Sequence, residues 1–137
     1  MKTKKSKGSV LVVEDDMLLS LVETRIIEKL GYTVIGKATS GEAAVKKVKS
    51  LNPDVIVMDI GLNGEMNGID ASRKIRAFAD TPIIFLSGDS NRESIKDAKK
   101  AGNSEYLIKP IKADDIMNPL KRAVKVRKES RRISQAS

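Results

Sequence analysis

Four consecutive apolar residues, Val55 to Met58, are followed directly by the carboxylate of Asp59. The run has no polar alternation, so neither face of the strand that it predicts can lie against water. Such a strand is typical of a parallel sheet with helices on both faces. Open sheets of this kind bind ligands outside the carboxyl ends of their strands, where Asp59 is expected. Taken alone, Asp59 is more often simply the first polar residue of a loop.

Helix-like segments separate this strand from four others. The predicted strands are residues 10–13, 33–38, 55–58, 82–86 and 106–108. No connection carries a hairpin signal, so five strands that alternate with five helices predict a parallel sheet. The expected fold class is therefore α/β, a doubly wound five-stranded parallel sheet with helices on both faces.

Apolar residues at helical spacing predict which face of each helix is buried. The first helix is expected from Met17 to Leu30, where Gly31 stops it. The faces expected to be buried are Leu18, Leu21, Val22, Ile26 and Leu30 in the first helix, Ala44, Val45, Val48 and Leu51 in the second, Ile69, Ala71, Ile75 and Phe78 in the third, and Ile116, Leu120, Ala123 and Val124 in the fifth. Pro119 lies inside the last helix, where we expect a kink or an irregular first turn.

The net charge of +8 is concentrated at the two ends of the chain. Residues 1–7 contribute +4 and residues 121–137 contribute +6, whereas the residues between them sum to −2. The folded body is therefore not expected to present a nucleic-acid-binding face. The chain has only two Tyr, two Phe and no Trp, which leaves few rings for base stacking.

The composition also bears on the compartment. The chain has no cysteine, which excludes disulfides and thiolate metal sites and fits a reducing compartment. No apolar run has the length of a signal peptide core or a membrane span. We expect a cytoplasmic protein of one domain with no membrane span.

Polar residues follow several of the predicted strands. Glu14, Asp15 and Asp16 follow the first strand, Asp59 the third, Ser87 the fourth and Lys109 the fifth. Parallel strands bring their carboxyl ends to one edge of a sheet, so these groups are expected to meet. Adjacent carboxylates repel one another unless solvent or a cation neutralises them.

Together these residues resemble the receiver domain of two-component response regulators. The motifs are Val-Val-Glu14-Asp15, Val-Met-Asp59, Leu-Ser87-Gly and Tyr106-Leu-Ile-Lys109-Pro110, and the resemblance covers roughly residues 9–128. Each motif is weak alone, but this order and spacing is highly specific. The resemblance implies a flavodoxin-like sheet with strand order 2-1-3-4-5. It also divides the chain into a basic tail at residues 1–8, a receiver domain at residues 9–128, and a tail or start of a linker at residues 129–137.

The resemblance assigns Asp59 as the phosphoacceptor and Mg²⁺ as the cofactor. A carboxylate nucleophile suits a transferable acyl phosphate, and oxygen ligands suit Mg²⁺. By the resemblance, Asp15, Asp59 and the backbone carbonyl of Gly61 bind the metal directly, and Glu14 acts mostly through water. Asp16 has no such role and is expected to cap the first helix.

Further roles follow from the same resemblance. Lys109 pairs with phosphoryl oxygens, Ser87 donates its hydroxyl to one of them, and a cis bond before Pro110 aims the lysine. Tyr106 is the aromatic switch residue: its ring turns inward when Ser87 moves toward the phosphoryl group. The change is then displayed on the face formed by the fourth helix, fifth strand and fifth helix.

Three positions are expected to modify this chemistry. The loop after Asp59 is one residue longer than the commonest form and has Asn63 near the place of its usual proline. Gly88 replaces the usual alanine after the hydroxyl residue, which would loosen the switch. Gly61 and Asp89 are the residues expected to tune the hydrolysis of the acyl phosphate.

The expected function is a signalling receiver rather than an enzyme, although it assists its own phosphorylation and dephosphorylation. The partner is a sensor histidine kinase or a histidine phosphotransfer protein, and the output partner is unknown. The chain is either a stand-alone receiver or the front of a longer regulator, and a phosphorylation-dependent homodimer is open. The alternative is a receiver-like interaction module that works without phosphate, with its function in the basic tails or in a dimer face. A metal-dependent phosphatase is disfavoured, because it needs an acid where Gly61 stands.

Overall fold

The computed structural model describes residues 5–88 and 92–136. Five strands and five helices alternate along the chain. The strands are β1 (Ser9–Val13), β2 (Thr33–Ala38), β3 (Val55–Asp59), β4 (Ile83–Ser87) and β5 (Ser104–Ile108). The helices are α1 (Met17–Lys29), α2 (Gly41–Leu51), α3 (Gly68–Arg76), α4 (Arg92–Lys100) and α5 (Ala113–Ala136).

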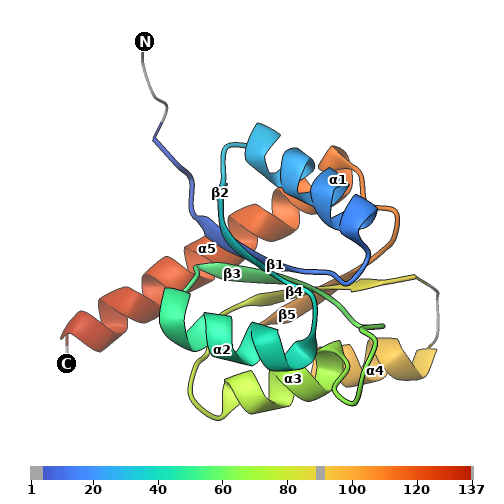
Figure 1. Cartoon of the computed structure of the whole chain (residues 1–137). Helices are drawn as coiled ribbons and strands as arrows, with labels where there is room; N and C mark the ends of the chain where they lie inside the picture. Colours follow the sequence, from blue (N-terminus) through green and yellow to red (C-terminus); the bar gives the residue numbers. More distant parts are fainter. Residues whose placement is uncertain (1–4, 89–91, 137) are drawn as a thin grey trace.

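The five strands form one parallel sheet in the order β2-β1-β3-β4-β5, which confirms the predicted topology. Helices α1 and α5 lie on one face, and α2, α3 and α4 cover the other (Figure 1). Strands β3 and β4 are buried at every residue, whereas the edge strands β2 and β5 are partly exposed. The run of apolar residues before Asp59 is therefore at the centre of the fold.

Each face of the sheet has its own apolar core. Leu11, Ile56, Met58 and Phe85 pack toward α2 and α3. Val12, Val57 and Leu86 pack on the other face with residues of α1 and α5. The expected stripe of α5 is confirmed, because Ile116, Leu120, Ala123 and Val124 are all buried.

The predicted buried face of α1 is wrong for three of its five residues, whereas Ile26 and Leu30 are partly buried against the core as expected. Leu18, Leu21 and Val22 are 70%, 42% and 43% exposed. The residues that α1 buries are Ser20, Glu23, Thr24 and Ile27. This helix carries apolar residues around most of its circumference, so their spacing predicts a helix but does not decide which side packs on the sheet.

Two further residues of the predicted stripes are exposed. Leu51, at the last position of α2, is 38% exposed, and Phe78, beyond the end of α3, is 42% exposed. The ammonium group of Lys49 lies 4.9 Å from the centroid of the Phe78 ring. Both residues are at helix ends, and the Leu51 side chain lies over Gly36 of the edge strand β2.

Gly68 begins α3 close to β3. A Cβ atom there would collide with the backbone carbonyl of Asp59, so only glycine allows this approach. Asn67 and Asp70 cap the helix reciprocally. The start of α3 is thereby packed directly against the end of the central strand.

Helix α5 continues past residue 128 to Ala136, so the predicted boundary between domain and tail falls inside it. Pro119 lies within the helix, which runs without a break from Ala113 to Ala136, and the kink expected there stays a prediction. Arg127 is only 8% exposed and donates hydrogen bonds to Asp80 and Asn52, at 2.9 Å and 2.7 Å. Arg131 donates to Asp54 at 2.5 Å.

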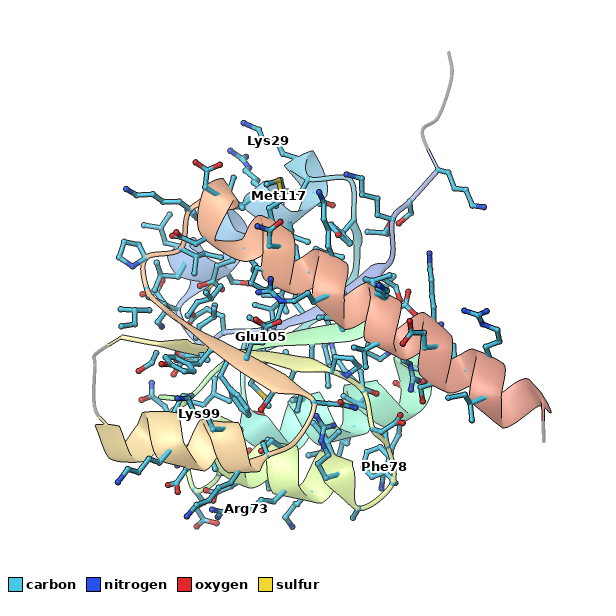
Figure 2. The ribbon with its side chains drawn as sticks, turned by 180° about the vertical axis from the view of Figure 1, so that it is seen from behind. Lys29, Arg73, Phe78, Lys99, Glu105 and Met117 are labelled. Carbon is cyan, nitrogen blue, oxygen red and sulfur yellow. The ribbon has the colours of Figure 1, made fainter. Side chains whose placement is uncertain are left out.

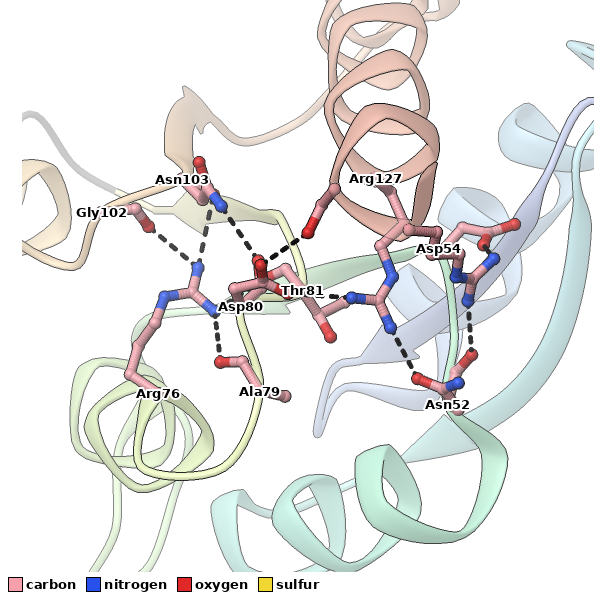
Figure 3. A network of polar contacts seen from close by, with 11 residues as sticks. Asn52, Asp54, Arg76, Ala79, Asp80, Thr81, Gly102, Asn103 and Arg127 are labelled. Atoms are coloured by element: carbon pink, nitrogen blue, oxygen red, sulfur yellow. Dashed lines mark hydrogen bonds and ion pairs between the residues drawn. The ribbon is translucent and has the colours of Figure 1, made fainter. Parts of the chain in front are cut away.

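The strand ends that face Arg127 and Arg131 are also linked by Arg76. Its guanidinium donates to the carbonyls of Thr81, Ala101 and Gly102, at 2.7–3.0 Å. Figure 3 shows these contacts around the amino ends of β3, β4 and β5. We call the group of Asn52, Asp54, Asp80, Arg127 and Arg131 the arginine network. Arg127 and Arg131, which belong to the basic C-terminal end at residues 121–137, are therefore structural parts of the body.

Among the described residues, none of the helices has the length and apolar composition needed to cross a membrane.

Candidate functional site

The register of the sheet brings the polar strand ends to one level. Val13 pairs with Met58, Asp59 with Leu86, and Ser87 with Ile108. The backbone bonds continue one residue further, from the Glu14 N–H to Ala38, and from the Lys109 N–H to Ser87. The predicted site residues after β1, β3, β4 and β5 therefore lie together at the carboxyl edge of the sheet.

Glu14, Asp15 and Asp59 form an acidic cluster at this edge. One carboxylate oxygen from each lies within 4.8 Å of the others. Glu14 is 1% exposed and Asp59 is 4% exposed, whereas Asp15 is partly exposed. The cluster is thus buried on the protein side and open toward the loops.

Lys109 joins two of these acids. Its ammonium lies 3.1 Å from a Glu14 oxygen and 3.1 Å from an Asp59 oxygen. The side chain of Lys109 is 14% exposed. The peptide bond between Lys109 and Pro110 is cis, as expected.

Backbone amides donate to three other carboxylate oxygens of the cluster, one of them Glu14 Oε2, which accepts from the Asp16 N–H at 3.2 Å. The Gly61 N–H donates to Asp59 Oδ1 at 3.0 Å, and the Asn63 N–H donates to Asp15 Oδ2 at 2.9 Å. Asp16 does not join the acidic cluster but caps α1, where it accepts a bond from the Leu19 N–H. This confirms the predicted separation of Asp16 from the other acids.

The electrostatics of the site follow from burial and crowding. Burial raises the pKa of Glu14, and the neighbouring Asp59 raises it further. Burial alone would lower the pKa of Lys109, but its bonds to Asp59 and Glu14 outweigh that effect and raise it. Lys109 is therefore held as a cation between two carboxylates.

Glu23 is a further acid that the sequence did not suggest. It is 2% exposed on the buried face of α1, and burial together with the adjacent Glu14 raises its pKa to about 9. One of its carboxyl oxygens is buried and has no hydrogen-bond partner among the described residues. In the sequence, only the position of Glu23 along the helix bears on its burial. If Leu18 and Val22 face the core, as predicted, Glu23 faces solvent.

The other predicted residues lie around the cluster. Ser87 is buried at the end of β4, and Tyr106 lies partly buried on β5, with the Lys99 ammonium 5.5 Å from its ring centroid. Tyr106 is thus outside the acidic cluster, on the neighbouring edge strand. A Cβ atom at Gly88 would meet nothing within 4 Å. Asp89 lies outside the described residues.

The donor set can be tested against a hard divalent cation. All ligand groups that converge here are oxygens, and three carboxylates face a single lysine, so a cation is favoured. Mg²⁺ prefers one or two carboxylates together with waters and phosphate oxygens. The partly open Asp15 leaves room for such waters, so these residues fit Mg²⁺.

Comparisons with known proteins agree with this geometry. A family model described as the response regulator receiver domain matches residues 10–121. The chemotaxis protein CheY of Thermotoga maritima is 37% identical over 117 residues, which are 85% of this chain and 97% of that protein. The transcriptional regulatory protein PdtaR of Mycobacterium tuberculosis is 31% identical over 84% of this chain, which spans only 56% of that protein.

Two solved structures extend the comparison. The signal receiver domain of a modulated diguanylate cyclase from Desulfovibrio desulfuricans has a TM-score of 0.80 and 32% identity, over 90% of this chain and 98% of that one. The receiver domain of the sensor histidine kinase PA1611 from Pseudomonas aeruginosa has a TM-score of 0.77 and 30% identity, over 86% of this chain and 98% of that one. The latter structure has a magnesium ion coordinated in its active site cleft.

Proposed function

The chain belongs to the response regulator receiver family of two-component signalling, and on that basis we propose that Asp59 accepts a phosphoryl group from a phosphohistidine on a partner protein. The observation that carries the proposal is the arrangement of Asp59, which is bound by Lys109 and lies within 4.8 Å of two other acids at the carboxyl edge. One nucleophilic carboxylate, one cation and an oxygen cluster are the parts that such a transfer needs.

The protein contributes position and charge. Asp59 Oδ2 faces Lys109, and Oδ1 is held by the Gly61 amide, so the carboxylate has a fixed orientation. Lys109 would neutralise a phosphoryl oxygen, and the hydroxyl of Ser87 would donate to another. Asp15, Asp59 and the Gly61 carbonyl would hold Mg²⁺, with Glu14 acting through water. A bound Mg²⁺ supplies positive charge to the transferring group.

Signalling then depends on a change beyond the site. Ser87, at the end of β4, lies beside β5, which carries Tyr106. Movement of Ser87 toward a phosphoryl oxygen would let the Tyr106 ring turn inward. The altered surface is the one formed by α4, β5 and α5, and it would be read by an output partner or by a second copy of the chain.

The exposed face of α1 supports the delivery of phosphate by a protein. Met17, Leu18, Leu21 and Val22 are 83%, 70%, 42% and 43% exposed, and they follow Asp15 and Asp16 directly. An apolar helix face beside a phosphorylation site suits the packing of a helix from the partner, a kinase or phosphotransfer protein. Leu18→Ser should slow transfer from a protein donor while leaving transfer from a small phosphodonor unchanged.

The matched relatives differ in how much of their length this chain covers. The chain spans almost all of CheY and about half of PdtaR. A stand-alone receiver and a receiver joined to an output domain therefore both remain consistent with the proposal, with residues 9–128 as the receiver.

The test is intact mass after incubation with acetyl phosphate, with and without Mg²⁺. The wild type should gain the mass of one phosphoryl group only with Mg²⁺, and Asp59→Asn should gain none. Asp114→Asn is the matched control, because Asp114 is exposed in the first turn of α5 and should leave labelling intact. Labelling that persists in Asp59→Asn would show that the acceptor is another residue.

A further inference from the structure

The two basic ends of the chain meet on one face of the fold. Lys7 donates its backbone N–H to Gly31 at 2.9 Å, and its side chain lies over Gly31. Gly8 accepts a bond from Thr33 and lies so close to α5 that a Cβ atom there would be 2.9 Å from Val124. The N-terminal segment is therefore held beside α5, which carries most of the C-terminal charge.

The cations of α5 form one stripe. Lys121, Lys125, Lys128 and Arg132 are separated by four, three and four residues, so they share one side of the helix. All four are exposed, and over eleven residues the stripe is about 16 Å long. Figure 2 shows α5 lying across this side of the molecule, with side chains projecting along its length.

A groove of about 400 Å³ runs between this stripe and the N-terminal segment. Its charged lining consists of Lys7, Lys121, Lys125, Lys128, Arg132 and Glu129, a net charge of +4. We call these five cations the basic groove. A second hollow adjoins it, with Lys5, Lys7, Glu28 and Lys29 as its charged lining, and shares Lys7 with it.

The charge of the basic groove is not neutralised by the protein itself. The other α5 arginines are engaged, because Arg122 pairs with Glu105, Arg127 with Asp80 and Arg131 with Asp54. Among the described residues, no ion pair involves the cations of the groove. They are thus available to a ligand with repeated negative charge.

We infer that the basic groove binds the phosphodiester backbone of a double-stranded nucleic acid. Protein interfaces have an apolar centre, and membrane-surface helices insert an apolar face. This groove offers neither, because Tyr32 and Val124 in its floor are 5% and 6% exposed. Contacts with phosphates need only a row of cations.

The inferred binding is independent of base sequence. No exposed ring in the described groove can stack on a base, and Tyr32 is buried in the apolar core. The groove is built from the two charged ends of the chain, but α5 places Lys121, Lys125 and Lys128 within the folded body. The inference therefore revises the expectation that this body has no nucleic-acid-binding face. Binding should therefore follow the number of phosphates contacted and fall steeply with salt.

The test measures binding of the full chain to fluorescein-labelled 20-base-pair DNA and RNA duplexes, by anisotropy across a series of salt concentrations. The slope of log affinity against log salt should be about −4, from four to five phosphate contacts. Replacing Lys121, Lys125 and Lys128 together by Gln should weaken binding at least tenfold and reduce the magnitude of the slope by about 3. The two duplexes distinguish DNA from RNA as the source of the backbone.

The matched control replaces Lys46, Lys74 and Lys100 by Gln. These lysines are exposed on α2, α3 and α4, on the opposite face, and their loss changes net charge by the same amount. The control should bind within about threefold of the wild type. Equal weakening of both variants would overturn the inference, since net charge alone would then explain binding. Absence of duplex binding near 50 mM salt, or binding to phosphatidylserine vesicles in its place, would overturn it as well.

Discussion

The carboxyl edge and the amino edge of the sheet each contain a group of buried or half-buried charged side chains. The two groups differ in the ratio of carboxylates to cations. At the carboxyl edge, Glu14, Asp15 and Asp59 face one cation, Lys109. At the amino edge, Asp54 and Asp80 face two, Arg131 and Arg127. The carboxyl edge therefore has an excess of carboxylates, whereas each carboxylate of the arginine network is paired with a guanidinium.

This difference separates a reactive site from a structural one. In the arginine network, a bond from Ser130 and the charge of Arg127 lower the pKa of Asp80, so its charged form is stabilised. At the acidic cluster, burial and like charge raise the pKa values of Glu14 and Glu23. A network whose charges are matched adds stability, and one left unmatched can bind a cation and react.

The largest expected effect concerns Glu23. Its pKa is about 9 in the folded protein, against about 4.5 when it is free of these interactions. The folded state therefore binds more protons than the unfolded state between these values, and stability falls as pH rises from about 5 to about 9. The slope can reach about 1.4 kcal/mol per pH unit for one proton.

Urea unfolding in EDTA at several pH values measures this slope. Glu23→Gln keeps the shape of the side chain, removes its titration and should flatten the curve. Glu28→Gln, on the same helix but exposed, is the control and should leave the slope unchanged. An unchanged slope in Glu23→Gln would show that another group titrates in this range.

Arg127→Ala should be the next largest change, because it leaves Asp80 and Asn52 without the guanidinium that bonds both. Hydrogen bonds to charged groups predict a loss of about 2 kcal/mol in the free energy of unfolding. Phosphorylation by acetyl phosphate should persist, since the network lies at the other edge. Arg132→Ala, on the exposed side of α5, should change the free energy of unfolding by less than about 0.5 kcal/mol.

The smallest effect is expected at Asp80, whose side chain is 59% exposed. Its lowered pKa means that its contribution is present above about pH 4 and is lost as the pH falls through the folded value. The contribution of Asp80 to stability therefore increases with pH, whereas that of Glu23 decreases with pH. Asp80→Asn should reduce the loss of stability on acidification, with Asp97→Asn, at a partly exposed position of α4, as the comparison. If wild type and Asp80→Asn lose equal stability on acidification, the arginine network does not cause that loss.

The strands and the acidic cluster were predictable because their patterns are local. The short, unalternating run from Val55 to Met58 predicts a strand covered on both faces, and parallel pairing then places Asp59, Ser87 and Lys109 at one edge. The topology and the cis bond before Pro110 came from the family resemblance, and the structure contains both.

The features that were missed depend on contacts between distant segments. Leu18 and Val22 fit a buried face as well as an exposed one, so the wrong choice for α1 also concealed Glu23. Arg127 and Arg131 looked like parts of a solvated tail, since their partners Asp80 and Asp54 lie 47 and 77 residues away. Charge counts along a sequence do not reveal which cations a fold will neutralise.

Helix α5 has a mechanical consequence. It begins three residues after Pro110 and is anchored by Arg127, about 21 Å further along its axis. A rotation of about 5° around this anchor would displace the first turn by about 2 Å. It would also have to move the buried stripe of Ile116, Leu120, Ala123 and Val124 across the sheet. The chain has no cysteine, so two introduced cysteines carrying spin labels, one on the first turn of α5 and one on β1, could measure that rotation directly.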